Sequence, residues 1–87
     1  MTRRRDDAPV DEIEPVTVDA TGLLCPLPII ELAKAARGRP SGTLVTVVCT
    51  DLAARIDVPA WARMTGHHFV GEKKTDGGAV ALTVRLR

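Results

Sequence analysis

The pattern of apolar residues between Val16 and Cys49 constrains the fold most strongly. Residues 16–20 alternate apolar and polar side chains, which is the period of a strand with one buried face. Residues 26–37 place apolar side chains on one side and charged ones on the other, which predicts an amphipathic helix of about three turns. Residues 43–49 are β-branched and nearly all apolar, as in a central strand. A helix of this length between two strands predicts a parallel βαβ unit.

A second helical region follows this unit. Its apolar spacing predicts a helix that ends at Gly66, a residue well suited to a helix C-terminus. Pro59 lies inside the region, and a proline in a helix interior removes a hydrogen bond and clashes with the preceding turn. We therefore expect a short turn over residues 52–56 and a helix that restarts near Val58. Met64 is spaced to share the buried face of Val58.

The end of the chain predicts a β-hairpin. Residues 68–75 and 79–87 read as two strands, and Asp76-Gly77-Gly78 between them is a turn signal. The element order is then β-α-β-α-β-β. We expect an α/β (α+β) two-layer sandwich in which both helices cover one face of a four-stranded mixed sheet.

The 87 residues divide into a polar N-terminal tail, residues 1–14, and one domain, residues 15–87. The tail mixes arginines with acidic residues and holds almost nothing apolar, so we expect it to be disordered. No apolar segment follows the arginines as in a signal peptide, and no stretch approaches the roughly 18 apolar residues of a membrane span. We therefore expect a cytoplasmic protein.

The charge balance does not favour nucleic acid as a partner. The formal net charge is +1, the basic residues are spread along the chain, and acidic residues follow the N-terminal arginines immediately. The chain contains one Trp, one Phe and no Tyr, which leaves little aromatic surface for stacking on bases. We expect no direct binding to nucleic acid.

Cys25 lies where the loop after the first strand enters the first helix. The first amides of a helix have no intrahelical partner and its dipole is positive there, so the position predicts a thiolate favoured over a thiol. Pro26 is expected at the first helical position and Pro28 in the same turn, where a missing N–H is harmless. The amides of Leu27 and Ile29 then remain free to meet the sulfur. Cys25 is a candidate nucleophile; the alternative is an ordinary small core residue.

Three further residues lie near this position. Gly22 permits a tight approach to the helix, and Asp19, at the end of the first strand, either caps the Cys25 loop or faces solvent. Cys49 ends the second strand, so both cysteines fall at carboxyl ends of neighbouring strands, a usual place for a site. Cys49 is either a core strand residue or a disulfide partner for Cys25. Two cysteines without a CxxC pair and two adjacent histidines predict no metal site, and nothing predicts a cofactor.

Two segments resemble the TusA (SirA-like) sulfur-carrier family. DATGLLCPLP, residues 19–28, contains a Cys-Pro-x-Pro motif entering the first helix. TDLAARIDVPAW, residues 50–61, is similar to the family's Thr-Asp-Pro-Ala…Asp-Ile-Pro-x-Trp/Phe segment. The resemblance covers residues 16–87 and implies the same β-α-β-α-β-β sandwich.

The resemblance implies a sulfur carrier, or sulfurtransferase, with Cys25 as its catalytic residue. Cys25 would accept a sulfane sulfur from a cysteine desulfurase or a rhodanese-like protein and relay it, as a persulfide, to an acceptor protein. Members of the family serve tRNA thiolation, sulfur oxidation, thiosulfate uptake or molybdoenzyme maturation. The alternative is a regulatory or adaptor module that keeps the fold without the chemistry. We expect a monomer, because so small a domain must expose its site to large partners.

Several residues beside the motif are expected to shape the site or to select the partner. Pro26, Leu27 and Pro28 would hold the thiol in one orientation. Leu27 replaces an acidic residue of the best-known tRNA-thiolation members, and a docking protein would contact this position. Arg55 and Asp57 match polar positions of the second segment, and they either steer partners or pair with each other.

Overall fold

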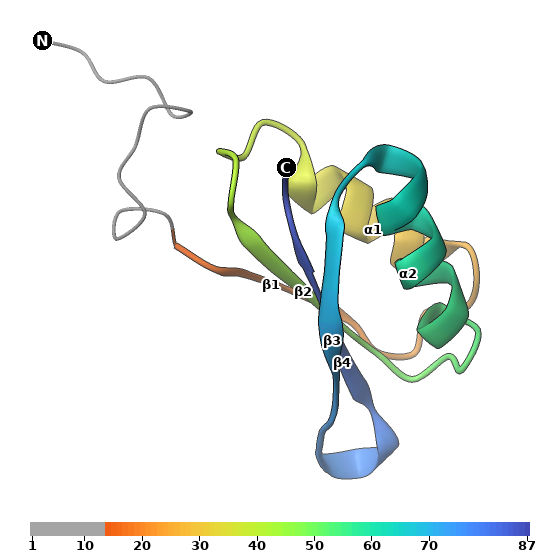
Figure 1. The fold of residues 1–87 in the computed structure, drawn as a ribbon. Coiled ribbons are helices and arrows are strands. Elements are labelled where there is room, and N and C mark those ends of the chain that lie inside the picture. Colours follow the sequence, from red (N-terminus) through yellow and green to blue (C-terminus); the bar gives the residue numbers. More distant parts are fainter. Residues whose placement is uncertain (1–13) are drawn as a thin grey trace, which may run out of the picture.

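Four strands form one mixed sheet, and two helices cover the same face of it (Figure 1). The structure is a computed structural model that describes residues 14–87, so the predicted tail, residues 1–14, lies outside the described residues except for Glu14. In chain order the elements are β1 (Val16–Ala20), α1 (Leu27–Ala36), β2 (Leu44–Cys49), α2 (Ala54–Thr65), β3 (His68–Lys74), the 3₁₀ turn η3 (Asp76–Gly78) and β4 (Val80–Arg85).

The strand order across the sheet is β1-β2-β4-β3. β1 and β2 are parallel, as the predicted βαβ unit requires, and β4 pairs antiparallel with both β2 and β3. The predicted β-α-β-α-β-β sandwich is therefore confirmed. Ala20 lies opposite Cys49 at the end of the parallel pair, so the loops that follow β1 and β2 leave the sheet at the same edge.

The core lies between the sheet and the two helices. Strands β2 and β4 alternate buried and more exposed residues, which places one row of aliphatic side chains against the helices. Full burial of a Val or Leu side chain stabilises the fold by about 1.5–3 kcal/mol, so this row carries much of the stability of a small domain. The buried side chains of these two strands and the two helices include Val45, Val47, Cys49, Val80, Leu82, Val84, Leu32, Val58 and Ala62.

Helix α2 differs from the prediction because it is continuous. It runs from Ala54 to Thr65 with Pro59 inside it, so the expected break between residues 56 and 58 was wrong. Val58 and Ala62 lie on either side of the proline and are fully buried, and tertiary packing of a buried face routinely outweighs an unfavourable local propensity. Met64 was also misplaced, because its side chain is 86% exposed.

The end of α2 agrees with the prediction. Gly66 caps the helix with φ +80°, a left-handed conformation that residues with a Cβ rarely adopt. Within residues 14–87, neither helix has the length and apolar character needed to cross a membrane.

Candidate functional site

The site is built from the β1–α1 loop and the β2–α2 loop, which leave the sheet at the carboxyl ends of its two parallel strands. Two hydrogen bonds join these loops. The Gly22 amide donates to Thr50 Oγ1 at 3.0 Å, and the Cys25 amide donates to Asp51 Oδ2 at 2.7 Å. Gly22 has φ +80°, which allows the first loop to turn toward the second. These contacts fix the backbone of Cys25 against the start of α2.

Asp19 stabilises the first turn of the β1–α1 loop. Its Oδ1 accepts hydrogen bonds from the Thr21 hydroxyl at 2.7 Å and from the Thr21 amide at 3.0 Å. Both bonds favour the ionised carboxylate, and they hold the pKa of Asp19 below its ordinary value. Asp19 bonds within the loop that leads to Cys25 and is also exposed to solvent, so both features that the sequence suggested are present together.

The start of α1 differs from the prediction by one residue. Pro26 is the N-cap and Leu27 the first helical residue, so Pro28 alone lies within the first turn. The Leu27 amide donates to the Leu24 carbonyl at 2.9 Å, and the Ile29 amide donates to the Pro26 carbonyl at 3.1 Å. The prediction that these two amides are free to meet the sulfur was wrong, because the tight turn before the helix already uses them.

The Cys25 thiol is exposed and faces a carboxylate. Its Sγ lies 3.3 Å from Asp57 Oδ2 on α2, and the thiol donates a hydrogen bond to that oxygen. This hydrogen bond is the largest influence that raises the pKa of Cys25 above its ordinary value, followed by partial desolvation and by the negative charges of Asp57 and Asp51. The expectation of a depressed pKa, based on the helix dipole, was therefore wrong.

Asp57 was predicted to contact a partner or Arg55, and its contact with the thiol was missed. Arg55 instead forms an ion pair with Glu72 on β3, with Arg55 Nη2 and Glu72 Oε2 2.7 Å apart. The expected break in α2 prevented any prediction of where Asp57 points. In a continuous helix that begins at Ala54, the position of Asp51 beside Cys25 brings the first turns of α2 near the thiol.

Cys49 lies in the core and does not share this environment. Its side chain has no exposed surface, it is opposite Val80 on β4, and its Sγ lies 3.9 Å from the Val80 carbonyl oxygen. Burial is the main cause that raises the pKa of Cys49, with a smaller contribution from the charge of Asp51. Both cysteines are free thiols, and of the two alternatives for Cys49 the structure shows the core strand residue.

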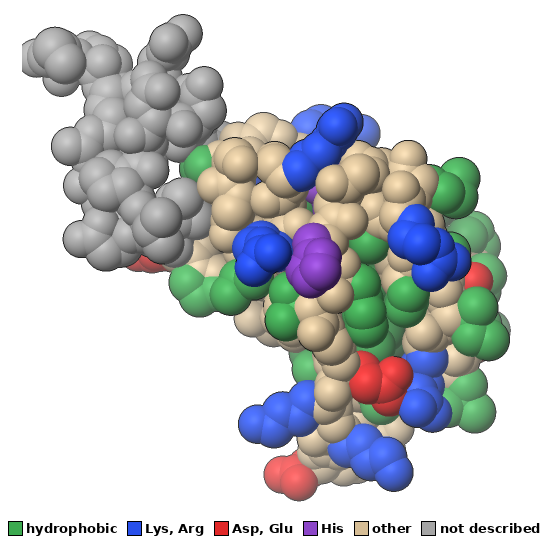
Figure 2. Space-filling model, in the orientation of Figure 1, with side chains coloured by type: hydrophobic (Ala, Val, Ile, Leu, Met, Phe, Trp, Pro, Cys, Tyr) green, Lys and Arg blue, Asp and Glu red, His purple; other side chains and the backbone are tan. Residues whose placement is uncertain are grey.

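Four exposed aliphatic side chains are sequence neighbours of Cys25 or of the two aspartates that contact it, and we call them the apolar collar. Leu24 and Leu27 flank Cys25 along the chain and are 70% and 44% exposed. Leu52 follows Asp51 and Ile56 precedes Asp57, and they are 71% and 75% exposed. Figure 2 shows hydrophobic side chains gathered along the side of the molecule where α2 and the site loops lie. Exposed apolar side chains gathered on one side of a small domain are typical of a protein-binding surface.

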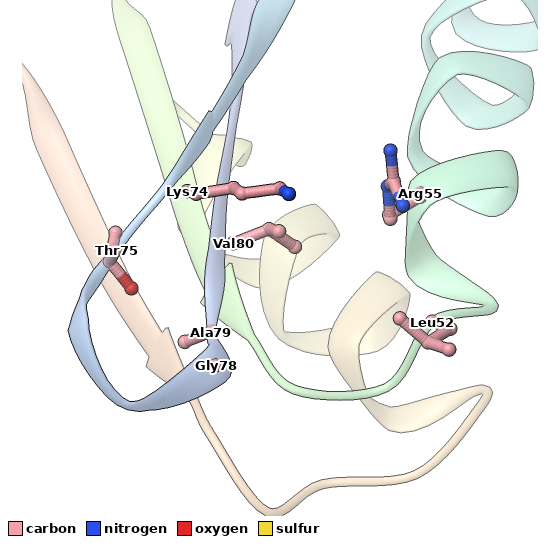
Figure 3. A pocket seen from close by; sticks show the side chains of 7 residues that line it. All are labelled: Leu52, Arg55, Lys74, Thr75, Gly78, Ala79 and Val80. Atoms are coloured by element: carbon pink, nitrogen blue, oxygen red, sulfur yellow. The ribbon is translucent and has the colours of Figure 1, made fainter.

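A pocket adjoins the collar between the start of α2 and the β3–β4 hairpin (Figure 3). It has a volume of about 280 Å³ and shares Leu52 with the collar. Arg55 from α2 and Lys74 from β3 extend into it from opposite walls, above an apolar floor that includes Val80. Lys74 therefore gives the pocket a positive charge beside apolar surface, whereas the charge of Arg55 is paired with Glu72. In the part of the chain from residue 14 onward, no group of three or more His, Cys, Asp or Glu side chains is placed to hold a metal ion.

Comparisons with known proteins agree on one family. The family model described as "Sulfurtransferase TusA" matches residues 16–86. The "Sulfur carrier protein TusA" of Pseudomonas entomophila is 37% identical over 67 residues, which cover 77% of this chain and 84% of that protein. The protein of the same name from Pseudomonas savastanoi is 38% identical over 71 residues, with the same two coverages.

A solved structure extends the agreement to three dimensions. The crystal structure of a SirA-like protein from Desulfitobacterium hafniense superposes with a TM-score of 0.66 and 27% identity, over 80% of this chain and 95% of that one. The family model matches nearly every described residue, and the Cys-Pro-x-Pro motif lies at the entrance to α1 of this four-stranded sheet. The chain therefore belongs to the TusA family of sulfur carrier proteins.

Proposed function

We propose that the protein is a sulfur carrier that accepts a sulfane sulfur as a persulfide on Cys25 and relays it to an acceptor protein. The observation that carries this proposal is the position of the thiol. It is exposed at the entrance to α1, its backbone amide is bonded to Asp51, and the segments that carry it and Asp51 also carry the exposed side chains of the apolar collar. Membership of the TusA family supports the same role.

The chemistry requires only a thiol that a second protein can reach. The Cys25 thiolate attacks the terminal sulfur of a donor persulfide, the S–S bond of the donor breaks, and a new S–S bond forms at Cys25. The donor leaves as a thiolate, which takes up a proton, so the transfer involves no net oxidation. Passing the sulfur onward repeats this exchange with Cys25 as the leaving group.

Two parts of the surface would receive the partners. The apolar collar supplies the desolvated centre that protein interfaces need, and the pocket beside it supplies positive charge at the rim. The donor is a persulfide-bearing protein such as a cysteine desulfurase or a rhodanese-like protein. We expect the carrier to act as a cytoplasmic monomer, because an exposed site on a small domain is open to large partners from one side.

A mass-spectrometric assay tests the proposal directly. The protein is incubated with a persulfidated cysteine desulfurase or rhodanese, separated from it, and analysed intact and after proteolysis. We expect a gain of one sulfur atom located on the peptide that contains Cys25. Cys25→Ser should abolish this gain, and Cys49→Ser, the matched control, should retain it. Sulfur that still loads onto Cys25→Ser would overturn the assignment.

One observation favours a second function, an adaptor that keeps the fold without the chemistry. The raised pKa of Cys25 makes the free protein a weaker nucleophile than an isolated cysteine at neutral pH. An adaptor would bind its partner equally well as Cys25→Ser and would gain no sulfur in the assay above. A sulfur carrier would gain sulfur and lose that gain in the variant.

A further inference from the structure

We propose that Asp57 keeps the Cys25 thiol protonated in the free protein, and that the partner which loads it supplies a cationic side chain that pairs with Asp57 and releases the thiolate. The inference rests on the proposed function and names a chemical feature of the partner. It explains how a thiol that is exposed at all times can react mainly in a docked complex.

The geometry of the thiol shows why Asp57 opposes its ionisation. An ionised carboxylate is only an acceptor, so the 3.3 Å contact between Cys25 Sγ and Asp57 Oδ2 requires the proton to be on sulfur. Loss of that proton would remove the hydrogen bond and place two negative charges at the same separation. The free protein therefore favours the neutral thiol.

The other charged groups near the thiol do not relieve this repulsion. Among residues 14–87, the charges that act on Cys25 are those of Asp57 on α2 and Asp51 in the β2–α2 loop, and both are negative. Asp51 cannot move away easily, because its Oδ2 accepts from the Cys25 amide and its Oδ1 from the Ala53 amide at 3.1 Å. The cation nearest along α2, Arg55, is engaged by Glu72.

The apolar collar turns this arrangement into a requirement on the partner. Ile56 and Leu52 are sequence neighbours of Asp57 and Asp51 and are largely exposed. Asp57 Oδ2 lies 3.3 Å from the sulfur that the partner must reach, so a partner that docks over the thiol also removes water from this carboxylate. A carboxylate that loses water without gaining a cation is strongly unfavourable. An interface that buries the collar therefore needs a Lys or Arg side chain opposite Asp57, and Arg suits it best because its planar fork matches a carboxylate.

The same pairing would start the transfer. Once Asp57 pairs with the cation, the thiol proton is lost to solvent, and the thiolate attacks the terminal sulfur of the donor persulfide. One S–S bond breaks and one forms, and the leaving donor thiolate takes a proton from solvent, so atoms and charge balance. Asp57 holds and releases the reacting thiol but does not itself receive the sulfur.

The test compares Asp57→Asn with wild type and with Asp76→Asn, which removes a carboxylate from the exposed hairpin turn. Iodoacetamide should modify Cys25 of Asp57→Asn about threefold faster at neutral pH if its pKa falls by about one unit, since the larger thiolate fraction outweighs the lower nucleophilicity of each thiolate. The midpoint of the pH–rate profile should shift downward. Asp76→Asn should match wild type. An unchanged midpoint in Asp57→Asn would overturn the role of Asp57.

Two sulfur donors then test the partner. Glutathione persulfide carries no protein surface, so it should load Asp57→Asn faster than wild type. A persulfidated desulfurase or rhodanese that loads wild type should load Asp57→Asn more slowly, by about tenfold if the lost ion pair contributes about 1.4 kcal/mol. The rate at which this protein donor loads Asp57→Asn should also depend less on salt concentration than the rate for wild type. If both donors load Asp57→Asn faster than wild type, the proposal that the partner supplies a cation opposite Asp57 is overturned.

These outcomes differ from a failure of the proposed function. If wild-type Cys25 gains sulfur from neither donor, the carrier role fails, and the alkylation profile still decides whether Asp57 controls the thiol. Circular dichroism checks that Asp57→Asn is folded, and Asp57→Ser serves as a second variant without the carboxylate.

Discussion

Cys49 ends one of two neighbouring parallel strands and Cys25 lies in the loop after the other, and the two thiols have opposite environments. The register pairs Ala20 with Cys49, so Cys49 is the last residue of its strand, while Cys25 lies five residues beyond the end of β1. Cys49 points between the sheet and the helices and has no exposed surface, whereas Cys25 lies in a loop and is exposed. A few residues of chain beyond the strand end therefore separate a structural thiol from one that a partner can reach.

The pKa of each thiol is raised, but for different reasons. Burial dominates at Cys49, and the hydrogen bond to Asp57 dominates at Cys25. Burial cannot be reversed without opening the core, while a hydrogen bond at the surface can be broken by a partner. The same direction of pKa shift therefore has a different physical cause in the buried thiol and in the exposed one.

The largest expected difference is the rate of alkylation. Iodoacetamide should modify Cys25 of the native protein more than about 100-fold faster than Cys49, because Cys49 reacts only when the core opens. Quantitative mass spectrometry of the two cysteine peptides measures the ratio. In denaturant the two rates should become similar. Comparable rates in the native protein would show that the core around Cys49 opens readily and would remove the contrast.

The pH dependence of Cys25 alkylation tests the sign of its pKa shift. Below the midpoint the thiolate fraction, and with it the alkylation rate, should rise about tenfold per pH unit. A raised pKa moves this midpoint to higher pH. The midpoint should lie above that of free N-acetylcysteine measured in the same buffer series. A midpoint at or below the free compound would mean that the helix dipole, and not Asp57, dominates the site.

The stability of alanine variants should separate the two positions further. Cys49→Ala leaves a small cavity in the core and should lower the free energy of unfolding by about 1–2 kcal/mol. Cys25→Ala removes an exposed side chain and should change it by less than about 0.5 kcal/mol. Urea denaturation followed by circular dichroism measures both. Equal losses would contradict the assignment of Cys49 alone to the core.

The smallest expected effect concerns Asp51, whose charge acts on both thiols. Asp51→Asn keeps an acceptor oxygen and removes the charge, so the pKa of Cys25 should fall by only a fraction of a unit. The rate of Cys25 alkylation at neutral pH should then rise by less than about twofold. The increase should be smaller than that in Asp57→Asn. A larger increase would reverse the order in which the two carboxylates act on the sulfur.

The strands were the most predictable part of the fold. The alternation over residues 16–20 and the apolar run that ends at Cys49 are local signals, and the structure reproduces them closely. Gly66 ends α2 as predicted, because glycine lacks a Cβ and adopts a positive φ without steric cost. Pro59 gave a misleading local signal, since the packing of Val58 and Ala62 keeps the helix continuous.

The site was only partly predictable. The Cys-Pro-x-Pro motif identified Cys25 as the candidate nucleophile, but the carboxylates that bond to its amide and its sulfur lie 26 and 32 positions further along the chain. Local reasoning about a helix terminus therefore gave the wrong direction for the pKa.

The sequence by itself determined the order of strands and helices along the chain and the family, and it singled out Cys25 as the candidate nucleophile. These depend on side-chain periodicity, turn residues and a short motif, all of which act over a few neighbouring residues. Only the tertiary structure placed the carboxylates of Asp51 and Asp57 beside that residue. Electrostatic interactions depend on distance in space, and the packing of α2 against the Cys25 loop sets those distances.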